Sequence, residues 1–260
     1  MDITAFWPAG PGSLIAAVAI TVLAAFVKGA TGFAMPMIMI SGLASFLSAE
    51  LALALLIVPT LVTNVIQALD GGIRRAVETA RAYWRYIAIV LVAIAGSAQL
   101  VAILPQEVFF LSLGVPVMGF ALWMLSGRRV QAPPQVWRRI EVIMACIAGV
   151  IGGLSGVWGP PTVVWLTAIG ASKDQSVRVQ GVIYFAGACV LTLAHLQSGV
   201  LNRDTLPLSC AMVLPSLVGL WLGIRTRGRM DEARFRRWTL VVLILAGANL
   251  VRRGLIGLLD

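Results

Sequence analysis

Two short stretches of this chain combine glycine, a hydroxyl residue and proline in the same order, inside otherwise apolar sequence. They read Gly29-Ala30-Thr31-Gly32-Phe33-Ala34-Met35-Pro36 and Gly153-Leu154-Ser155-Gly156-Val157-Trp158-Gly159-Pro160, and both fit the pattern G-x-[ST]-G-x-x-x-P. Gly153 follows Gly29 by 124 residues, which is close to half of the 260-residue chain. This spacing indicates an internal duplication.

The residue types of the motif are suited to binding an anion. Proline is tolerated in the first turn of a helix, where its missing N–H would be unpaired anyway, so we expect Pro36 and Pro160 to begin half-helices. A helix start offers free N–H groups and partial positive charge, and Thr31 and Ser155 would add hydroxyl donors. Two such starts that converge in the membrane would form an anion site. The alternative is that small residues merely let helices pack closely.

A lysine, Lys28, directly precedes the first motif, deep in an apolar segment. A charge inside a membrane is a functional-site hypothesis by default, and we expect the bound anion to be its partner. As alternatives, its ammonium group could reach the membrane surface or bond to backbone carbonyls. The equivalent position in the second copy is Gly152, so the site would be asymmetric.

Aromatic and amide side chains provide further candidates. Phe33 and Trp158 could form walls of the site or face lipid. Asn64 and Gln180 follow the motifs in longer apolar segments, although such amides often bridge neighbouring helices. The predicted substrate-binding residues are Lys28, Gly29, Thr31, Gly32, Phe33, Asn64, Gly153, Ser155, Gly156, Trp158 and Gln180.

Residues for other chemistry are lacking. The three cysteines lie in apolar runs without metal-ligand spacing, so we expect no metal, no disulfide and no cofactor. Every Asp and Glu lies in a loop or at a segment end, which disfavours coupling through a buried carboxylate. The only histidine, His195, lies near a segment end and away from both motifs. We therefore expect it to have a packing role. With no catalytic constellation in the apolar segments, an enzyme is not expected.

The composition places the chain in a membrane. Of its residues 59% are hydrophobic and 12% are charged, and the mean hydropathy is +0.93, which predicts an all-α integral membrane protein. The net charge of +9 lies in short clusters between apolar runs, which argues against a nucleic-acid-binding face. The apolar runs are Leu14–Val27, Met37–Leu47, Leu51–Leu69, Ile87–Leu104, Val108–Leu125, Val142–Ile151, Thr162–Ile169, Val179–Leu196, Leu206–Ile224 and Trp238–Val251.

Two pairs of these runs are too short to span a bilayer singly, and each pair is divided by one motif. We therefore predict about eight hydrophobic segments in two inverted repeats, each consisting of a broken or re-entrant helix and three transmembrane helices. The expected divisions are a first repeat over residues 1–126, a cytoplasmic linker over 127–139 and a second repeat over 140–260.

Charge bias tests how the broken helices run. If each one enters and returns on the same side, all four basic clusters face the cytoplasm; if each crosses once, the last cluster faces outside, against the charge rule. We therefore expect Arg75, Arg129 and Arg229 inside and Asp2, Glu50, Glu107 and Asp204 outside. Arg252 and Arg253 do not fit this arrangement.

The two motifs and their flanking residues resemble those of a known protein family. Val27-Lys28-Gly29-Ala30-Thr31-Gly32-Phe33 and Gly152-Gly153-Leu154-Ser155-Gly156-Val157-Trp158-Gly159-Pro160-Pro161 resemble the paired motifs of the TauE/SafE sulfite exporter family. The resemblance implies a multi-pass permease of the bacterial cytoplasmic (inner) membrane that exports a small sulfur-containing anion such as sulfite, sulfoacetate or another organosulfonate. Ala34 and Met35 stand where the family often has a Gly-Gly run, so the size of the pocket stays open.

The leading function is a secondary transporter whose partners are a small anionic substrate and the lipid bilayer, without nucleic acid. The alternatives are an anion channel, an uptake permease for a small organic anion, and a non-transporting membrane partner protein. Assembly as a homo-oligomer stays open, as do the coupling ion and the direction of transport.

Overall fold

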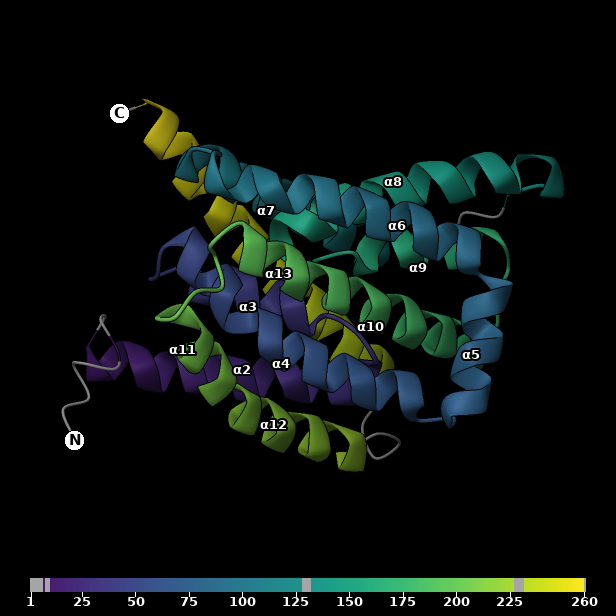
Figure 1. The fold of residues 1–260 in the computed structure, drawn as a ribbon, viewed down its shortest axis with the longest axis horizontal. Helices are drawn as coiled ribbons and strands as arrows, with labels where there is room; N and C mark the ends of the chain where they lie inside the picture. The colour runs from purple at the N-terminus through teal and green to yellow at the C-terminus, as the bar shows by residue number, and fades with distance from the viewer. Residues whose placement is uncertain (1–6, 8–9, 128–131, 227–231, 260) are drawn as a thin grey trace.

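The computed structural model describes residues 7, 10–127, 132–226 and 232–259, and every regular element in them is a helix (Figure 1). The first half contains α2 (Pro11–Thr31), α3 (Met35–Leu43), α4 (Ala49–Leu69), α5 (Ile73–Ala82), α6 (Trp84–Ser97), the short 3-10 helix η1 (Ala98–Ala102) and α7 (Gln106–Leu125). The second half contains the short 3-10 helix η2 (Pro134–Val136), α8 (Trp137–Ser155), α9 (Gly159–Ala168), α10 (Lys173–Gln197), α11 (Thr205–Ala211), α12 (Val213–Thr226) and α13 (Glu232–Leu259).

Seven helical stretches of the described residues are long and apolar enough to cross a membrane, which confirms the all-α membrane class. One of them corrects a prediction. The run Leu14–Val27 was expected to be too short to span, but α2 continues in both directions to a length of 21 residues. Helix α8 is not among the seven, because its first turns carry Arg138, Arg139 and Glu141.

Both motifs break the helix in the same way. Helix α2 ends at Gly32, with φ +86°, and α8 ends at Gly156, with φ +70°. This left-handed conformation suits glycine because any Cβ would be strained there. Helices α3 and α9 begin three residues after each glycine, with Pro36 and Pro160 in their first turns. The predicted half-helices are therefore confirmed.

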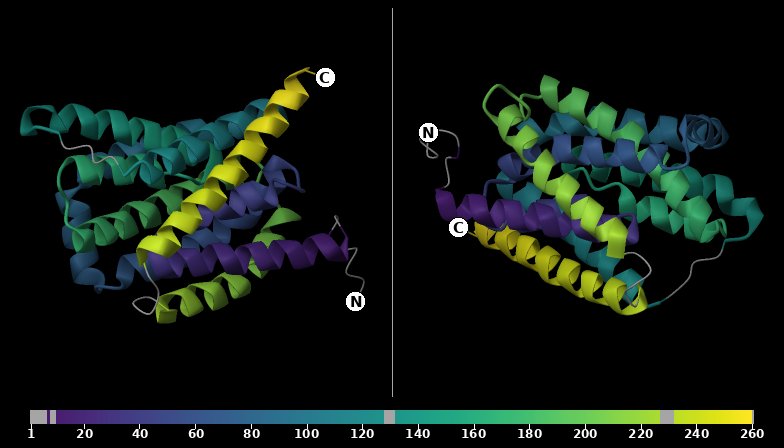
Figure 2. Two further views of the ribbon diagram at one scale, coloured as in Figure 1. Left: turned by 180° about the vertical axis from the view of Figure 1, so that it is seen from behind. Right: turned by 90° about the horizontal axis from the view of Figure 1, so that it is seen from below.

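Helices from the two halves pack against each other reciprocally (Figure 2). Helix α2 packs on α12, and its counterpart α8 packs on α6, while α4 packs on α10 and α7 on α13. The first glycine of each motif lies in these contacts: a Cβ on Gly29 would come within 2.4 Å of Leu220 O, and one on Gly153 within 2.7 Å of Ile94 O. Each half thus contributes helices to the packing of the other.

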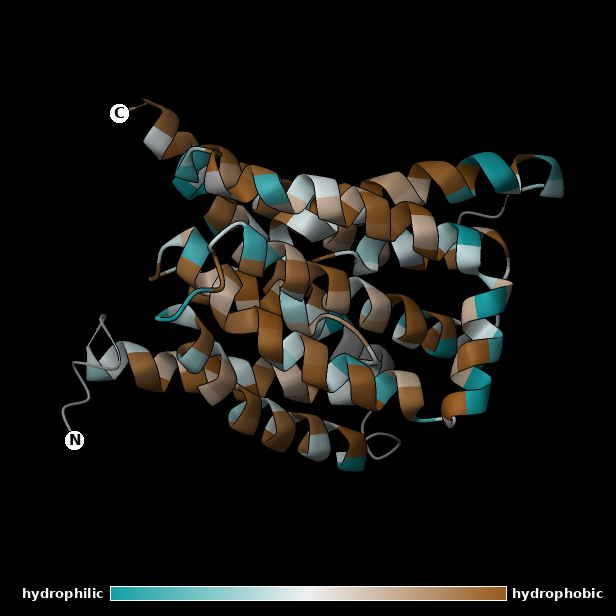
Figure 3. Cartoon of the chain, in the orientation of Figure 1, coloured by the Kyte–Doolittle hydropathy of each residue, from teal (hydrophilic) through white to brown (hydrophobic). Residues whose placement is uncertain are grey.

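Polar residues concentrate at the ends of the bundle, whereas the helix shafts are apolar (Figure 3). One end, termed the basic end, consists of α5, the C-terminal end of α4 and the first turns of α8 and α10 (Figure 1). It carries Arg75, Arg138 and Arg178. The start of α2 and the end of α13 lie at the opposite end. The other predicted cytoplasmic markers, Arg129 and Arg229, and the predicted external marker Asp2, lie outside the described residues.

Candidate functional site

The two helix breaks line one small cavity, termed the central cavity, with a volume of about 20 Å³. That volume holds about one water molecule. Its lining consists of Lys28, Phe33, Ala34, Pro36, Met37 and Asn64 from the first half and Gly156, Val157, Trp158, Gly159 and Tyr184 from the second. Residues of the two motifs, more than 120 positions apart in sequence, are therefore neighbours in space.

Lys28 is the only cationic residue in this lining, and its side chain is 3% exposed. Its Nζ donates a hydrogen bond to Thr63 Oγ1 at 3.0 Å and another to Asn64 Oδ1. Both partners are neutral. Among the described residues, the only ion pair within 4.0 Å is Arg74–Glu78, far along the chain on α5, so no carboxylate neutralises Lys28. The structure thus places a buried lysine amine without an ionic partner at the breaks.

A polar network holds Asn64 in place. Asn64 Nδ2 donates to the carbonyl oxygen of Tyr184 at 3.0 Å, and Tyr184 Oη donates to Gln180 Oε1 at 3.1 Å. The network joins α4, which carries Lys28's partners, to α10. Gln180 does not line the central cavity, and its amide orients Tyr184, which does.

The motif hydroxyl groups stabilise the breaks from within. Thr31 Oγ1 donates to Val27 O at 2.8 Å, and Ser155 Oγ donates to Ile151 O at 2.5 Å. Each oxygen also accepts a backbone N–H from two residues later, that of Phe33 or Val157. In this conformation both hydroxyl protons are used inside the helix that carries them, and neither Thr31 nor Ser155 lines the central cavity.

The motif aromatic residues lie on the cavity wall. Trp158 is 2% exposed and contacts the ring of Tyr184, with centroids 6.3 Å apart. Phe33 is half-buried and lines the same cavity from the first break. Of the motif glycines, Gly156 and Gly159 line the central cavity, whereas Gly153 lies in the contact between α8 and α6.

A second cavity of about 100 Å³, termed the inner cavity, begins on the other side of Lys28. Lys28, Gly29, Gly32, Thr63, Ile66, Gln67, Asp70, Val177, Leu220 and Ile224 line it. Because Lys28 lines both cavities, they adjoin at this residue. Gln67 Nε2 donates to Gly32 O at 3.1 Å and so joins α4 to the first break.

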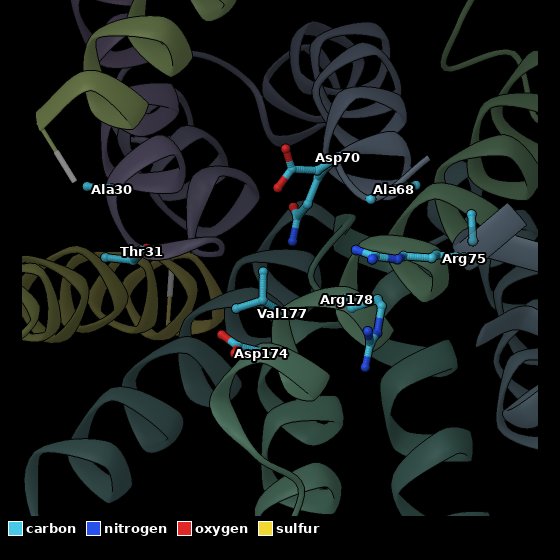
Figure 4. A pocket seen from close by; sticks show the side chains of 11 residues that line it. Ala30, Thr31, Ala68, Asp70, Arg75, Asp174, Val177 and Arg178 are labelled. Carbon is cyan, nitrogen blue, oxygen red and sulfur yellow. The ribbon is translucent and has the colours of Figure 1, made fainter. Parts of the chain in front are cut away.

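A larger cavity of about 440 Å³ follows at the basic end and is termed the vestibule (Figure 4). Its walls are the end of α2, the connection from α4 to α5 and the first turns of α10. Figure 4 shows Asp70, Arg75 and Thr31 around its centre, with the Arg178 side chain directed away from Asp70. Gln67, Asp70 and Val177 line both the vestibule and the inner cavity. The three cavities therefore form a series from the basic end to the helix breaks.

The predicted site omits residues that α4 and its C-terminal cap supply beside Asn64. Thr63 bonds to Lys28, while Gln67 and Asp70 line the route from the vestibule. The sequence does contain a signal for them: Thr60, Thr63, Gln67 and Asp70 recur at intervals of three or four in an apolar helix, which places them on one face.

The prediction that His195 lies away from both breaks is wrong. His195 is fully buried, and its Nε2 lies 3.2 Å from Gly153 O, while Nδ1 lies 3.1 Å from Ser198 Oγ. Because a carbonyl oxygen only accepts, Nε2 carries a proton in this contact. The last turn of α10 folds against the C-terminal half of α8, which brings the ring to the second motif.

The fold and the cavities together define a multi-span helical membrane protein with a buried lysine beside a cavity at two helix breaks. The family model for the sulfite exporter TauE/SafE matches residues 5–250, so the chain belongs to the TauE/SafE sulfite exporter family. It is a membrane transporter of the sulfite-exporter type, and the prediction of a transporter rather than an enzyme is confirmed. Neither a curated protein nor a solved structure matches the chain significantly.

Proposed function

We propose that this protein is a secondary transporter that exports a small sulfur-containing anion, such as sulfite, sulfoacetate or another organosulfonate. The anion binds at Lys28 between the starts of the two half-helices, near the middle of the membrane. The membrane is the bacterial cytoplasmic membrane, with the basic end of the bundle in the cytoplasm, in keeping with the positive-inside rule.

The buried Lys28 carries this proposal. A charge removed from water requires a counter-charge or a full set of hydrogen bonds, and the two neutral acceptors of Lys28 supply only part of this requirement. An ammonium group has three donors, so one remains for a ligand. An anion in the adjoining cavities supplies both the charge and the acceptor.

The two half-helices contribute unequally to the site. The first turn of α3 offers the N–H groups of Met35 and Met37, whereas Pro160 and Pro161 leave the first turn of α9 with few donors. Lys28 also belongs to the first copy. We infer that the first break holds the charged group and that the second break, with Trp158, encloses it.

The cavity volumes favour a carrier over a channel. The central cavity has room for about one water molecule, so an anion reaches it only after the two breaks separate. The vestibule and inner cavity supply a route from the basic end. We propose that the halves are inverted repeats, supported by the reciprocal packing of α2 on α12 and α8 on α6, and that their relative motion changes the side from which Lys28 is reached.

Counterflow in proteoliposomes tests the transport proposal. Vesicles loaded with unlabelled sulfite or an organosulfonate are expected to accumulate the labelled anion transiently, with a rate that saturates, whereas protein-free vesicles do not. A current proportional to voltage without counterflow would identify a channel. The absence of any anion flux in correctly folded protein would support the non-transporting alternative.

A further inference from the structure

The polar face of α4 lines the passage from the vestibule to Lys28, and its composition bears on which anions can pass. Two residues of this face, Gln67 and Asp70, line both the vestibule and the inner cavity. We propose that the inner cavity selects singly charged oxyanions that carry a hydrogen-bond donor, with Asp70 excluding doubly charged anions and Gln67 accepting the ligand's proton-bearing group. This inference rests on the proposed anion site at Lys28. It narrows the candidate substrates to hydrogensulfite and singly charged, hydroxyl-bearing organosulfonates, because sulfoacetate and unprotonated sulfite each carry two negative charges.

The charged residues around the inner cavity favour an anion with one negative charge over an anion with two. Lys28 is the only cation in its lining, and the arginines of the vestibule, Arg75 and Arg178, are not part of it. The cost of removing an ion from water grows with the square of its charge, whereas attraction to a single ammonium group grows only in proportion. For a doubly charged anion, the free energy of hydration lost on entry therefore exceeds the free energy gained by attraction to Lys28.

Asp70 adds repulsion on the same route. It follows the last turn of α4 and is exposed, and its carboxylate points into the vestibule in Figure 4. None of its side-chain oxygens lies within 4.0 Å of a described cationic group. The carboxylate is thus not neutralised, and it repels a doubly charged anion twice as strongly as a singly charged one.

Gln67 supplies the second criterion. Its Nε2 donates to Gly32 O, which fixes the orientation of the amide. Its Oε1 is buried and has no hydrogen-bond partner. A carbonyl oxygen can only accept, so the missing partner is a donor. Fully ionised oxyanions offer only acceptors, whereas a hydroxyl-bearing anion can donate to Gln67 while its charged oxygens approach Lys28.

Ligand-induced shifts of the thermal unfolding midpoint test this selectivity in the purified full-length protein. Three probes separate charge from hydrogen bonding: methanesulfonate, hydroxymethanesulfonate and sulfate. In the native protein we expect hydroxymethanesulfonate to bind more tightly than methanesulfonate, and sulfate to bind weakest. Equal binding of sulfate and methanesulfonate would overturn the charge criterion, although anion binding itself would stand. No binding of any probe would overturn the site at Lys28 as well.

Two variants assign the selectivity to residues. Asp70→Asn is expected to raise the affinity for sulfate relative to methanesulfonate about fivefold, and the control Asp204→Asn, at the opposite end of the bundle, is expected to leave the ratio unchanged. Gln67→Met is expected to abolish the preference for hydroxymethanesulfonate over methanesulfonate. Each ratio is measured within one variant, so a general loss of stability cancels. An unchanged ratio in either variant would remove that residue from the proposal.

Discussion

Replacing Lys28 with methionine keeps the length of the side chain and removes its charge and its donors. Lys28 is 3% exposed and has no carboxylate partner among the described residues. Under the proposed function, the transported anion is its counter-charge. Removing one partner of a buried charge pair costs about 3–5 kcal/mol. Taking the lower value, because the inner cavity admits water, Lys28→Met is expected to weaken anion binding about 100-fold.

The stability of the ligand-free protein is expected to change in a different way. The substitution removes two hydrogen bonds, to Thr63 and Asn64, each worth about 1 kcal/mol. It also removes a buried charge without a counter-charge, which is favourable. These effects oppose each other, so the unfolding midpoint without ligand should change little. Loss of binding without loss of folding is the signature of a ligand-directed charge.

The assay is isothermal titration of purified protein with methanesulfonate or sulfite, together with the anion-induced rise in the unfolding midpoint. Arg74→Met is the matched control, because it also removes one positive charge, but from an exposed position on α5 that lines neither the inner nor the central cavity. Native affinity in a folded Lys28→Met protein would refute the reasoning and exclude Lys28 from the site.

Three further predictions concern topology, the breaks and proton coupling. Cysteines placed at Arg75 and Asp204 should label from the cytoplasm and from outside, respectively, in intact cells, and labelling from one side only would contradict the re-entrant arrangement. Gly156→Ala should destabilise the protein by about 2 kcal/mol because of its positive φ and a contact of 2.9 Å with Leu56, whereas Gly12→Ala should be neutral in the same unfolding assay. Sulfite flux should respond to pH at constant membrane potential because sulfite changes protonation near neutral pH, whereas flux of a strong-acid sulfonate should not; equal responses would show that the protein itself titrates.

The helix breaks could be predicted from sequence because their cause is local. Glycine at a left-handed position ends one helix, and proline in a first turn begins the next. Each motif contains both residues within eight positions. The length of α2 could not be read in the same way, since Lys28 and Thr31 interrupt the apolar run without ending the helix.

The composition of the site depended on contacts between distant segments, which the motifs do not encode. Asn64 was expected from its place after the first break, but its bond to Tyr184 O joins residues 120 positions apart. The amphipathic helix α5 was not anticipated, because its polar residues resemble those of a loop. Gly29 and Gly153, two glycines of the predicted site, pack against backbone of the other half, and of these two only Gly29 also lines the inner cavity.

The pairing of α2 with α12 also sets an order for biosynthesis. Gly29 and Gly223 touch in the finished protein, although about 190 residues separate them along the chain. At a translation rate of about 5–20 residues per second, the ribosome completes α12 roughly 10–40 seconds after α2 has formed. During that interval the small-residue face of α2 has only lipid or the insertion machinery as a neighbour. Helix α2 is thus made long before its partner α12, and a chain truncated before α12 lacks the helix against which Gly29 packs.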